Sequence, residues 1–420
     1  MLYLFYMQEG DFIRKLIKGY YIETILFSYM ILVLVLAPFS NLPQELMQLV
    51  ISRDALVTDY IAVSGLSATL INVVLVMVFT LFIKRINHVE LNGFVIAGLL
   101  TTMGFAFFGK NIYNILPIYL GVFLYARSVK RPFKQFFVIA MFATGLAPLV
   151  TVGINFGILG LIIGSVIAVG YGFIIPAIAS HVIRFHNGYL LYNIGFSGGI
   201  VALILTAVLR VTGLDLEVVV NVNEAWDIHY ILFAILIGMS LLFISFGLLR
   251  ERFNWSRYKK LMSMSGRAVT DYYRIFGEGL MLVNMGIVGL MLTLLVAFSG
   301  IPLNGATVGS IISVMGFSAF GKNPKNIIPL ILGCILMIIV SGTVITPSVL
   351  LVLIFVTGLA PIAGEFGFVI GIIAGILHFS LVQYTAEWQG GANLYNNGFA
   401  GGFIAGVISS IMDSIAKRSM

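Results

Sequence analysis

Charged residues are scarce in this sequence, and that scarcity excludes most water-soluble folds. Only 10% of the 420 residues are Asp, Glu, Lys or Arg, whereas 60% are hydrophobic. A soluble domain carries about 25% charged residues, which cover its water-facing surface. Because this chain lacks the charge for such a surface, we expect lipid to be its main solvent.

Cysteine and recognisable catalytic motifs are also lacking. The one cysteine, Cys334, cannot form an intramolecular disulfide or a metal site built from cysteines. The sequence contains no His-x-x-x-His pair and no phosphate-binding loop that ends in Lys-Ser or Lys-Thr. We therefore expect no enzyme activity, no cofactor and no metal, and no ATP-driven soluble module fits in the chain.

Long apolar runs are what the sequence has instead, and they predict helices. Backbone groups in lipid must pair with one another, so only helices and closed barrels span a bilayer. Barrel strands alternate between lipid-facing and inward-facing residues, whereas runs such as 201–209 and 327–340 are almost continuously apolar. The predicted fold is therefore an all-α polytopic membrane protein.

An internal repeat organises the chain. The motif Val-Thr-Asp-Tyr at 57–60 recurs at 269–272, which is a separation of 212 in the numbering (271 − 59). With the same separation, Phe-Gly-Lys-Asn at 108–111 meets the same four residues at 320–323. The motifs Thr-Gly-Leu-Ala-Pro and Leu-Tyr-Asn-x-Gly-Phe-x-Gly-Gly also occur twice. We infer two copies of one unit.

The repeat divides the chain into four parts. Residues 19–212 form the first transmembrane unit, 213–227 an external connection, and 228–415 the second unit. Residues 1–18 mix apolar and charged side chains, which predicts a short amphipathic helix at the membrane interface. The predicted helical segments are 20–38, 62–83, 93–108, 112–126, 134–151, 155–178 and 189–209, then 230–249, 275–299, 305–320, 325–342, 346–363, 366–384 and 393–412.

Basic residues predict that the two units are inserted in opposite orientations. Cytoplasmic loops carry an excess of Lys and Arg, which also explains the net charge of +7 without a nucleic-acid partner. The loop 84–92 begins with Lys84 and Arg85, whereas its repeat partner 296–304 has no basic residue. Equivalent loops then lie on opposite sides of the membrane, and basic residues near both ends of the chain place both termini in the cytoplasm.

Opposite insertion requires an odd number of crossings in each unit. The third and fourth segments of each unit are at or below the usual length of a span, which is about 17–25 residues. Seven spans satisfy the requirement, and so do five spans with a re-entrant hairpin. We therefore expect inverted-topology repeats of about five to seven spans each, including short or re-entrant broken helices.

The duplicated Gly-Lys-Asn turns are the first candidate site. Glycine allows each turn, and asparagine caps the following helix. The start of a helix carries partial positive charge and a neighbouring lysine adds more, which suits an anion. Lys110, Asn111, Lys322 and Asn323 are therefore predicted to line a solute pathway. The alternative is an ordinary interfacial turn whose ammonium group reaches the lipid headgroups.

The other duplicated motifs add further candidates. Gly and Pro in Thr-Gly-Leu-Ala-Pro interrupt a helix, so Thr144 and Thr357 are predicted to offer hydroxyls or freed carbonyls to the solute. The alternative is a kink between packed helices. In the Leu-Tyr-Asn motifs, Asn193 and Asn396 are predicted binding residues, while the glycines are predicted to pack helices closely.

Two ionisable residues near the end of the chain suggest coupling to a proton. Such residues within spans are costly and usually functional. Glu365 is predicted to take up a proton and His378 to transfer one near neutral pH. The alternative places Glu365 in a loop at the water surface.

The chain resembles an uncharacterised family of bacterial multi-span membrane proteins in its Gly-Lys-Asn and Leu-Tyr-Asn blocks. That resemblance implies a location in the bacterial cell (inner) membrane. The chain also resembles urea transporters, which are duplicated, inverted units with Tyr-Asn near small residues and Asn-Pro before a helix, as at 395–396 and 323–324. It departs from them in lacking their Leu-Pro-x-x-Thr pore signature.

Inverted repeats are typical of secondary transporters. We therefore expect a secondary transporter of a small polar or anionic solute, with coupling to an ion or a proton as a further expectation. The alternatives are a passive channel for a small neutral solute, as in urea transporters, and a membrane scaffold or sensor. The expected partners are the lipid bilayer and the small-molecule or ion solute, and the sequence leaves a homo-oligomer open.

Overall fold

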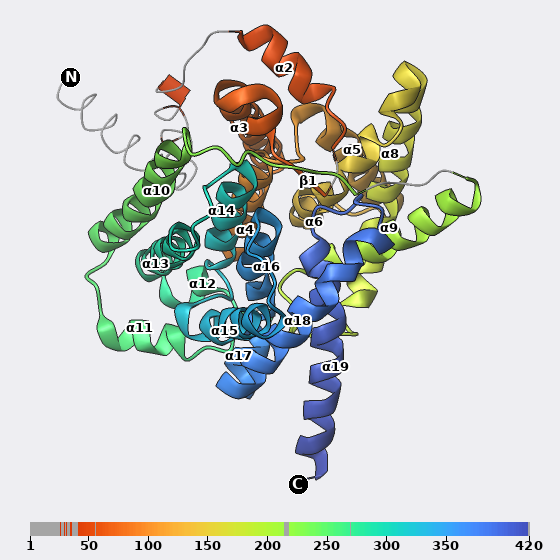
Figure 1. Cartoon of the computed structure of the whole chain (residues 1–420). Helices are drawn as coiled ribbons and strands as arrows, with labels where there is room; N and C mark the ends of the chain where they lie inside the picture. Colours follow the sequence, from red (N-terminus) through yellow and green to blue (C-terminus); the bar gives the residue numbers. More distant parts are fainter. Residues whose placement is uncertain are drawn as a thin grey trace, which may run out of the picture.

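The computed structural model is a multi-pass bundle of helices (Figure 1). It describes residues 41–418 except 55, 214–217 and 269, together with positions 26, 29, 31, 34 and 35. Within this part of the chain, nine helices are long and apolar enough to cross a bilayer. The chain is therefore a multi-pass helical membrane protein, as expected, while the predicted interfacial segment 1–18 lies outside the described residues.

The elements occur in the following order. They are α2 (Leu42–Val50), β1 (Val57–Thr58), α3 (Tyr60–Ile86), α4 (Gly93–Phe105), α5 (Ile112–Ser128), α6 (Phe137–Ala143), α7 (Pro148–Thr151), α8 (Gly157–Val182), α9 (Asn193–Val211), β2 (Val220–Asn221), α10 (His229–Arg250), α11 (Trp255–Met262), α12 (Tyr272–Phe276), α13 (Glu278–Ala297), α14 (Gly305–Phe317), α15 (Pro324–Ser341), α16 (Pro347–Phe355), α17 (Ala360–Phe366), α18 (Phe368–Trp388) and α19 (Asn396–Arg418). Short 3-10 turns occupy Thr144–Leu146 and Val356–Leu359, at the two Thr-Gly-Leu-Ala-Pro motifs.

The helices follow the repeat in the sequence element by element. α4 and α14 both have 13 residues, and their first residues, Gly93 and Gly305, show the same separation of 212 (305 − 93). Asp59 caps α3 and Asp271 caps α12. Both caps are followed by one helical turn and a glycine with positive φ, which breaks the helix before the long span begins.

The third predicted segments are short, but the fourth ones are not. A helix of 13 residues rises about 20 Å, less than the roughly 30 Å of a bilayer core. Every residue of α14 is buried in protein, which suits a helix too short to span. In contrast, α15 has 18 residues and is a full candidate span, and α5 has 17. Both expose leucines, such as Leu120 and Leu332.

α4 and α14 pack against each other in opposite directions in the interior of the bundle (Figure 1). A Cβ at Gly93 would lie 2.7 Å from the carbonyl oxygen of Ala319, beyond the end of α14, so the start of one helix meets the end of the other. Midway, Thr101 Oγ1 and Ser313 Oγ are 3.0 Å apart. These two residues are repeat partners (313 − 101 = 212), which places their contact on a pseudo-two-fold axis.

Contacts at the helix ends are reciprocal across this axis. The backbone N–H of Gly305 donates to Asp59 Oδ2 at 3.1 Å, and that of Gly93 donates to Asp271 Oδ1 at 3.2 Å. Each repeat thus caps the short helix of the other. A fully buried interface built in this way means that the two repeats fold as one body.

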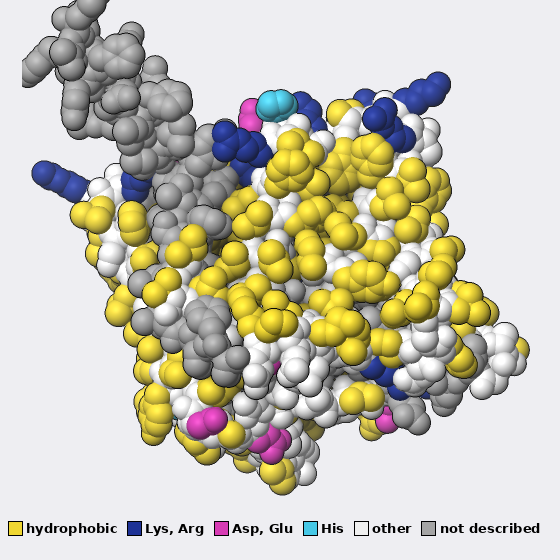
Figure 2. All heavy atoms as spheres, turned by 90° about the horizontal axis from the view of Figure 1, so that it is seen from above, with side chains coloured by type: hydrophobic (Ala, Val, Ile, Leu, Met, Phe, Trp, Pro, Cys, Tyr) yellow, Lys and Arg dark blue, Asp and Glu magenta, His cyan; other side chains and the backbone are white. Residues whose placement is uncertain are grey.

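The surface of the bundle matches a lipid environment. Figure 2 shows hydrophobic side chains over the middle of one face, with Lys and Arg gathered along its upper edge. On α8, the side chains of Ile158, Leu159 and Val166 are each at least 65% exposed. Exposed apolar area on this scale is stable only against lipid or another protein.

Candidate functional site

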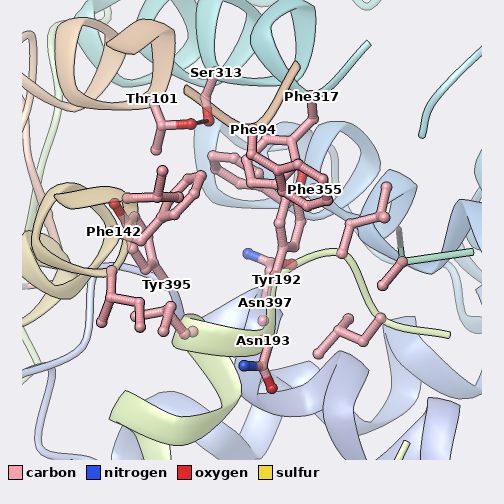
Figure 3. A pocket seen from close by; sticks show the side chains of 18 of the residues that line it. Phe94, Thr101, Phe142, Tyr192, Asn193, Ser313, Phe317, Phe355, Tyr395 and Asn397 are labelled. Atoms are coloured by element: carbon pink, nitrogen blue, oxygen red, sulfur yellow. Dashed lines mark hydrogen bonds between the residues drawn. The ribbon is translucent and has the colours of Figure 1, made fainter. Parts of the chain in front are cut away.

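A central cavity of about 190 Å³ lies on the pseudo-two-fold axis (Figure 3). The Thr101–Ser313 pair stands at one end of it, and aromatic rings from both repeats form its walls. Its lining includes seven repeat-related pairs, which are Thr101 and Ser313, Phe105 and Phe317, Phe142 and Phe355, Leu191 and Leu394, Tyr192 and Tyr395, Ile194 and Asn397, and Gly195 and Gly398. The remaining lining comes from one end of the molecule, as in Ile183, Asn193, Ala268 and Phe320.

A second cavity, of about 240 Å³, is lined by the repeat partners of most of those remaining residues. Leu56 and Phe108 correspond to Ala268 and Phe320 with the separation of 212 (268 − 56, 320 − 108). Ala386 and Asn396 correspond to Ile183 and Asn193 with the separation of 203 found in the Leu-Tyr-Asn blocks (386 − 183, 396 − 193). The two cavities are therefore related by the pseudo-two-fold axis.

Three residues line both cavities and separate them. They are Phe355 at the end of α16, Leu394 before α19, and Asn397 in its first turn. The ring of Phe355 lies 5.7 Å from that of Phe105 and 6.0 Å from that of Tyr192, centroid to centroid. The barrier between the cavities thus includes an aromatic ring that packs against rings of the first repeat.

Lys110 and Lys322 lie behind the wall of the central cavity and do not line it. Both are completely buried. The ammonium of Lys322 donates to the hydroxyl of Tyr192 and to Thr357 Oγ1, the latter at 2.9 Å. Lys110 donates to the hydroxyl of Tyr395. Each lysine thus holds a tyrosine of the other repeat.

Aromatic faces complete both lysine sites. The ammonium of Lys322 lies 4.3 Å from the ring centroid of Tyr192 and 5.0 Å from that of Phe317. For Lys110 the distances are 4.8 Å to Tyr395 and 5.0 Å to Phe105. Such distances allow cation–π attraction. Among the described residues, neither lysine forms an ion pair with a carboxylate.

The asparagines and threonines of the duplicated turns have local structural partners. Asn111 and Asn323 cap α5 and α15 through reciprocal bonds with the residue three positions on. Thr144 donates to the carbonyl oxygen of Met141, and Thr357 donates to the equivalent carbonyl in its own repeat. Thr357 also accepts the hydrogen bond from Lys322. None of the four lines either cavity, so they support the site from behind.

The two asparagines of the Leu-Tyr-Asn motifs lie in different cavities. Asn193 lines the central cavity and Asn396 the second one. The side-chain oxygen of Asn193 lies 3.0 Å from His186 Nε2, and its side-chain N–H donates to the carbonyl oxygen of Ala179. Asn396 accepts a hydrogen bond from Gln389 at 2.9 Å. The single site expected around both asparagines is therefore split between the two cavities.

Neither residue expected to carry a proton lines a cavity. Glu365 is exposed on α17, because the glycine that follows it turns the chain at the surface. His378 is buried on α18, where its Nε2 lies 3.1 Å from Asn397 Oδ1. Glu365 therefore borders neither cavity, and His378 contacts their lining through Asn397.

The residues that do line the central cavity include several that the sequence did not single out. Tyr192 and Tyr395 precede the asparagines chosen from the duplicated motif, and Thr101 and Ser313 lie on the short buried helices. The duplication of Leu-Tyr-Asn was a usable signal for the tyrosines. No sequence signal marks Thr101 and Ser313, because their partnership depends on how α4 packs on α14.

These features define a multi-pass helical membrane protein with a central cavity lined by residues of duplicated motifs. The chain belongs to the family described as "Protein of unknown function (DUF1576)", whose model matches residues 40–211 and 251–414. The matched stretches fall within the two repeats and leave out both the connection between them and α10. No curated protein and no solved structure matches the chain.

Proposed function

We propose that this protein is a secondary transporter that exposes a site on the pseudo-two-fold axis to the two sides of the membrane in turn. The observation that supports it is the pair of repeat-related cavities, which are separated by Phe355, Leu394 and Asn397. Two related halves can exchange conformations. One cavity would then reach the axis in the first state and the other cavity in the second. In the described state it is the central cavity that reaches the Thr101–Ser313 contact.

The charges suggest which side each cavity faces. Ala268 follows the most basic loop of the chain, which contains six Lys and Arg residues between 250 and 267. Excess Lys and Arg favours the cytoplasm. The second cavity is bordered by Val218 and Val220, from the connection that carries four acidic residues between 215 and 227. The described state is then open towards the cytoplasm, in a bacterial inner membrane with both termini inside.

The lining favours a largely apolar solute over the small anion expected from the lysines. None of the described residues that line the central cavity is charged. An apolar cavity of about 150 Å³ binds benzene, and this one is slightly larger, at about 190 Å³. The hydroxyl groups of Thr101 and Ser313 provide hydrogen bonds for one polar group. We propose a solute with an aromatic or branched body and a single polar end.

The opposite insertion of the repeats gives a first prediction. Cysteines introduced at Asn87 and at Ser299, in loops that correspond in the two repeats, should react with a membrane-impermeant maleimide from opposite sides. The background is Cys334→Ala, which removes the one native cysteine. Labelling of both positions from one side would contradict inverted repeats.

Alternating exposure gives a second prediction, which is tested with a bulky label that acts as a wedge in the second cavity. In a Leu56→Cys, Ala268→Cys variant without Cys334, a bulky impermeant maleimide is first added from outside to react in the second cavity. The adduct should hold that cavity open and slow later labelling of Ala268→Cys from the cytoplasmic side at least several-fold. The single Ala268→Cys variant, treated identically, is the control. An unchanged rate would favour the passive channel.

A further inference from the structure

Asp54 is a buried carboxylate on which three helices converge. Its side chain is 3% exposed. The hydroxyl of Tyr60 on α3 donates to Oδ1 at 2.9 Å, and the side-chain amide of Asn114 on α5 donates to Oδ2 at 2.9 Å. The backbone N–H of Asp54 donates to Thr151 Oγ1 on α7 at 3.1 Å. The loop between α2 and β1 is thereby fastened to the bundle.

The second repeat keeps the neighbours of this carboxylate but not the carboxylate. Its equivalent position is Gly266 (54 + 212), where φ is 78° and a Cβ would lie 2.0 Å from the carbonyl oxygen of Gly321. The partner of Asn114 is Asn326, which donates to the backbone carbonyl of Ser265. The second repeat therefore closes the same gap with backbone alone.

The difference between Asp54 and Gly266 indicates that the carboxylate has a function beyond filling space in the fold. The tyrosine and the cap are retained, since Asn323 donates to Tyr272 at 3.0 Å as Asn111 donates to Tyr60 at 3.1 Å. If the fold needed only a filled gap at this position, the less costly arrangement of the second repeat would serve in the first. Burying a carboxylate is costly, and it lies only two residues before Leu56, which borders the second cavity.

We propose that Asp54 binds a proton from the side of the second cavity and that the bound proton favours the closed form of that cavity. The inference rests on the proposed alternating transporter, because it assigns one step of the cycle to this group. The step is the reversible binding of one proton to one carboxylate. It supplies a candidate coupling group in place of Glu365.

The direction of the effect follows from burial. Asp54 lies outside the candidate spans. Burial raises the pKa of its carboxyl to about 7, although hydrogen bonds lower this pKa in part. These bonds involve Tyr60, Asn114, Ser52 and Thr151. Opening the second cavity would hydrate the loop and return this pKa towards about 4. The closed form then binds the proton more tightly, so a rise in pH from about 4 to about 7 favours opening.

Other charged groups lie nearby and are included in the test. Burial also raises the pKa of Asp59, to about 6, while the backbone N–H groups of Asn223, Ile61 and Gly305 lower it. Arg53 precedes Asp54 in the chain and Lys110 precedes the cap Asn111 on the helix that carries Asn114. Among the described residues, no ion pair joins either cation to Asp54.

The experiment measures labelling of Leu56→Cys from outside, in proteoliposomes and without Cys334, between pH 5 and pH 8. Each rate is divided by that of Ser299→Cys, a position expected on the same side, which removes the pH dependence of the thiol itself. We expect the ratio to rise by up to about tenfold per pH unit up to about pH 7 and then to level off. Asp54→Asn, which resembles the protonated acid, should give a low ratio at every pH.

Two further variants complete the test. Asp54→Glu retains a carboxyl group, so its labelling ratio should still rise with pH. In Asp59→Asn, the part of the rise in the labelling ratio that occurs near pH 7 should remain. A flat ratio in the unsubstituted background, or an unchanged rise in Asp54→Asn, would overturn the role of Asp54. Failure of the wedge experiment at every pH would instead overturn the transporter proposal, so the two failures are distinguishable.

Discussion

Replacing Gly104 with leucine should prevent the protein from accumulating in a folded form. A Cβ at this position would lie 2.1 Å from the carbonyl oxygen of Gly309, a backbone atom of α14 that cannot rotate away. Overpacking a core costs about 1–3 kcal/mol, and we expect the upper end or more here, because α4 and α14 must separate along their whole contact. Size-exclusion chromatography of detergent extracts measures the folded fraction.

Gly170→Leu is the matched control for this substitution. Gly170 lies on α8, and no atom lies within 4 Å of a Cβ built there. This variant should elute like the unsubstituted protein. A normal elution profile for Gly104→Leu would show that the two short helices are not in contact through their backbones.

Replacing Asn284 with alanine should strongly lower the free energy of unfolding. Its amide on α13 donates to the carbonyl oxygens of Ser318 and Lys322, both at 2.8 Å, and so holds the turn that follows α14. We expect a loss of about 1–3 kcal/mol for each of the two buried carbonyls that lose their partner. A membrane-adapted thermal shift assay, calibrated by denaturant titration, measures the change.

The repeat provides an internal replicate and a control for this prediction. Asn72 donates to the carbonyl oxygens of Ala106 and Lys110 at the same 2.8 Å, so Asn72→Ala should cost a similar amount. Asn87 is half-buried and donates to Ile83 at the end of its own helix, so Asn87→Ala should change stability by less than about 0.5 kcal/mol. Equal effects at all three positions would refute the role assigned to the turn.

Much of the fold could be predicted from the sequence because the repeat and the apolar runs are local signals. The constant separation between the two copies locates the starts of α4 and α14, and the apolar runs locate the long helices.

The candidate site was harder to predict because it is made of contacts between the repeats. Lysine and asparagine were chosen for their chemistry, yet Lys110 and Lys322 face tyrosines of the other repeat and not a cavity. Which side chain borders the cavity depends on the crossing of α4 and α14, which no local pattern encodes. Asp54 was missed for a related reason, since its significance lies in the glycine at the equivalent position.

The short parallel pairing of β1 with β2 makes the two ends of the molecule energetically unequal. Val57 pairs with Val220, and the backbone N–H of Asp59 donates to the carbonyl oxygen of Asn221 at 2.8 Å. This tether belongs to the connection between the repeats, which exists once and crosses one end only (Figure 1). Two identical, unjoined halves would form an assembly with identical rates in both directions. In the proposed carrier, joining the halves in one chain adds hydrogen bonds to one gate alone, so the carrier would work as a rectifier, faster from one face than from the other.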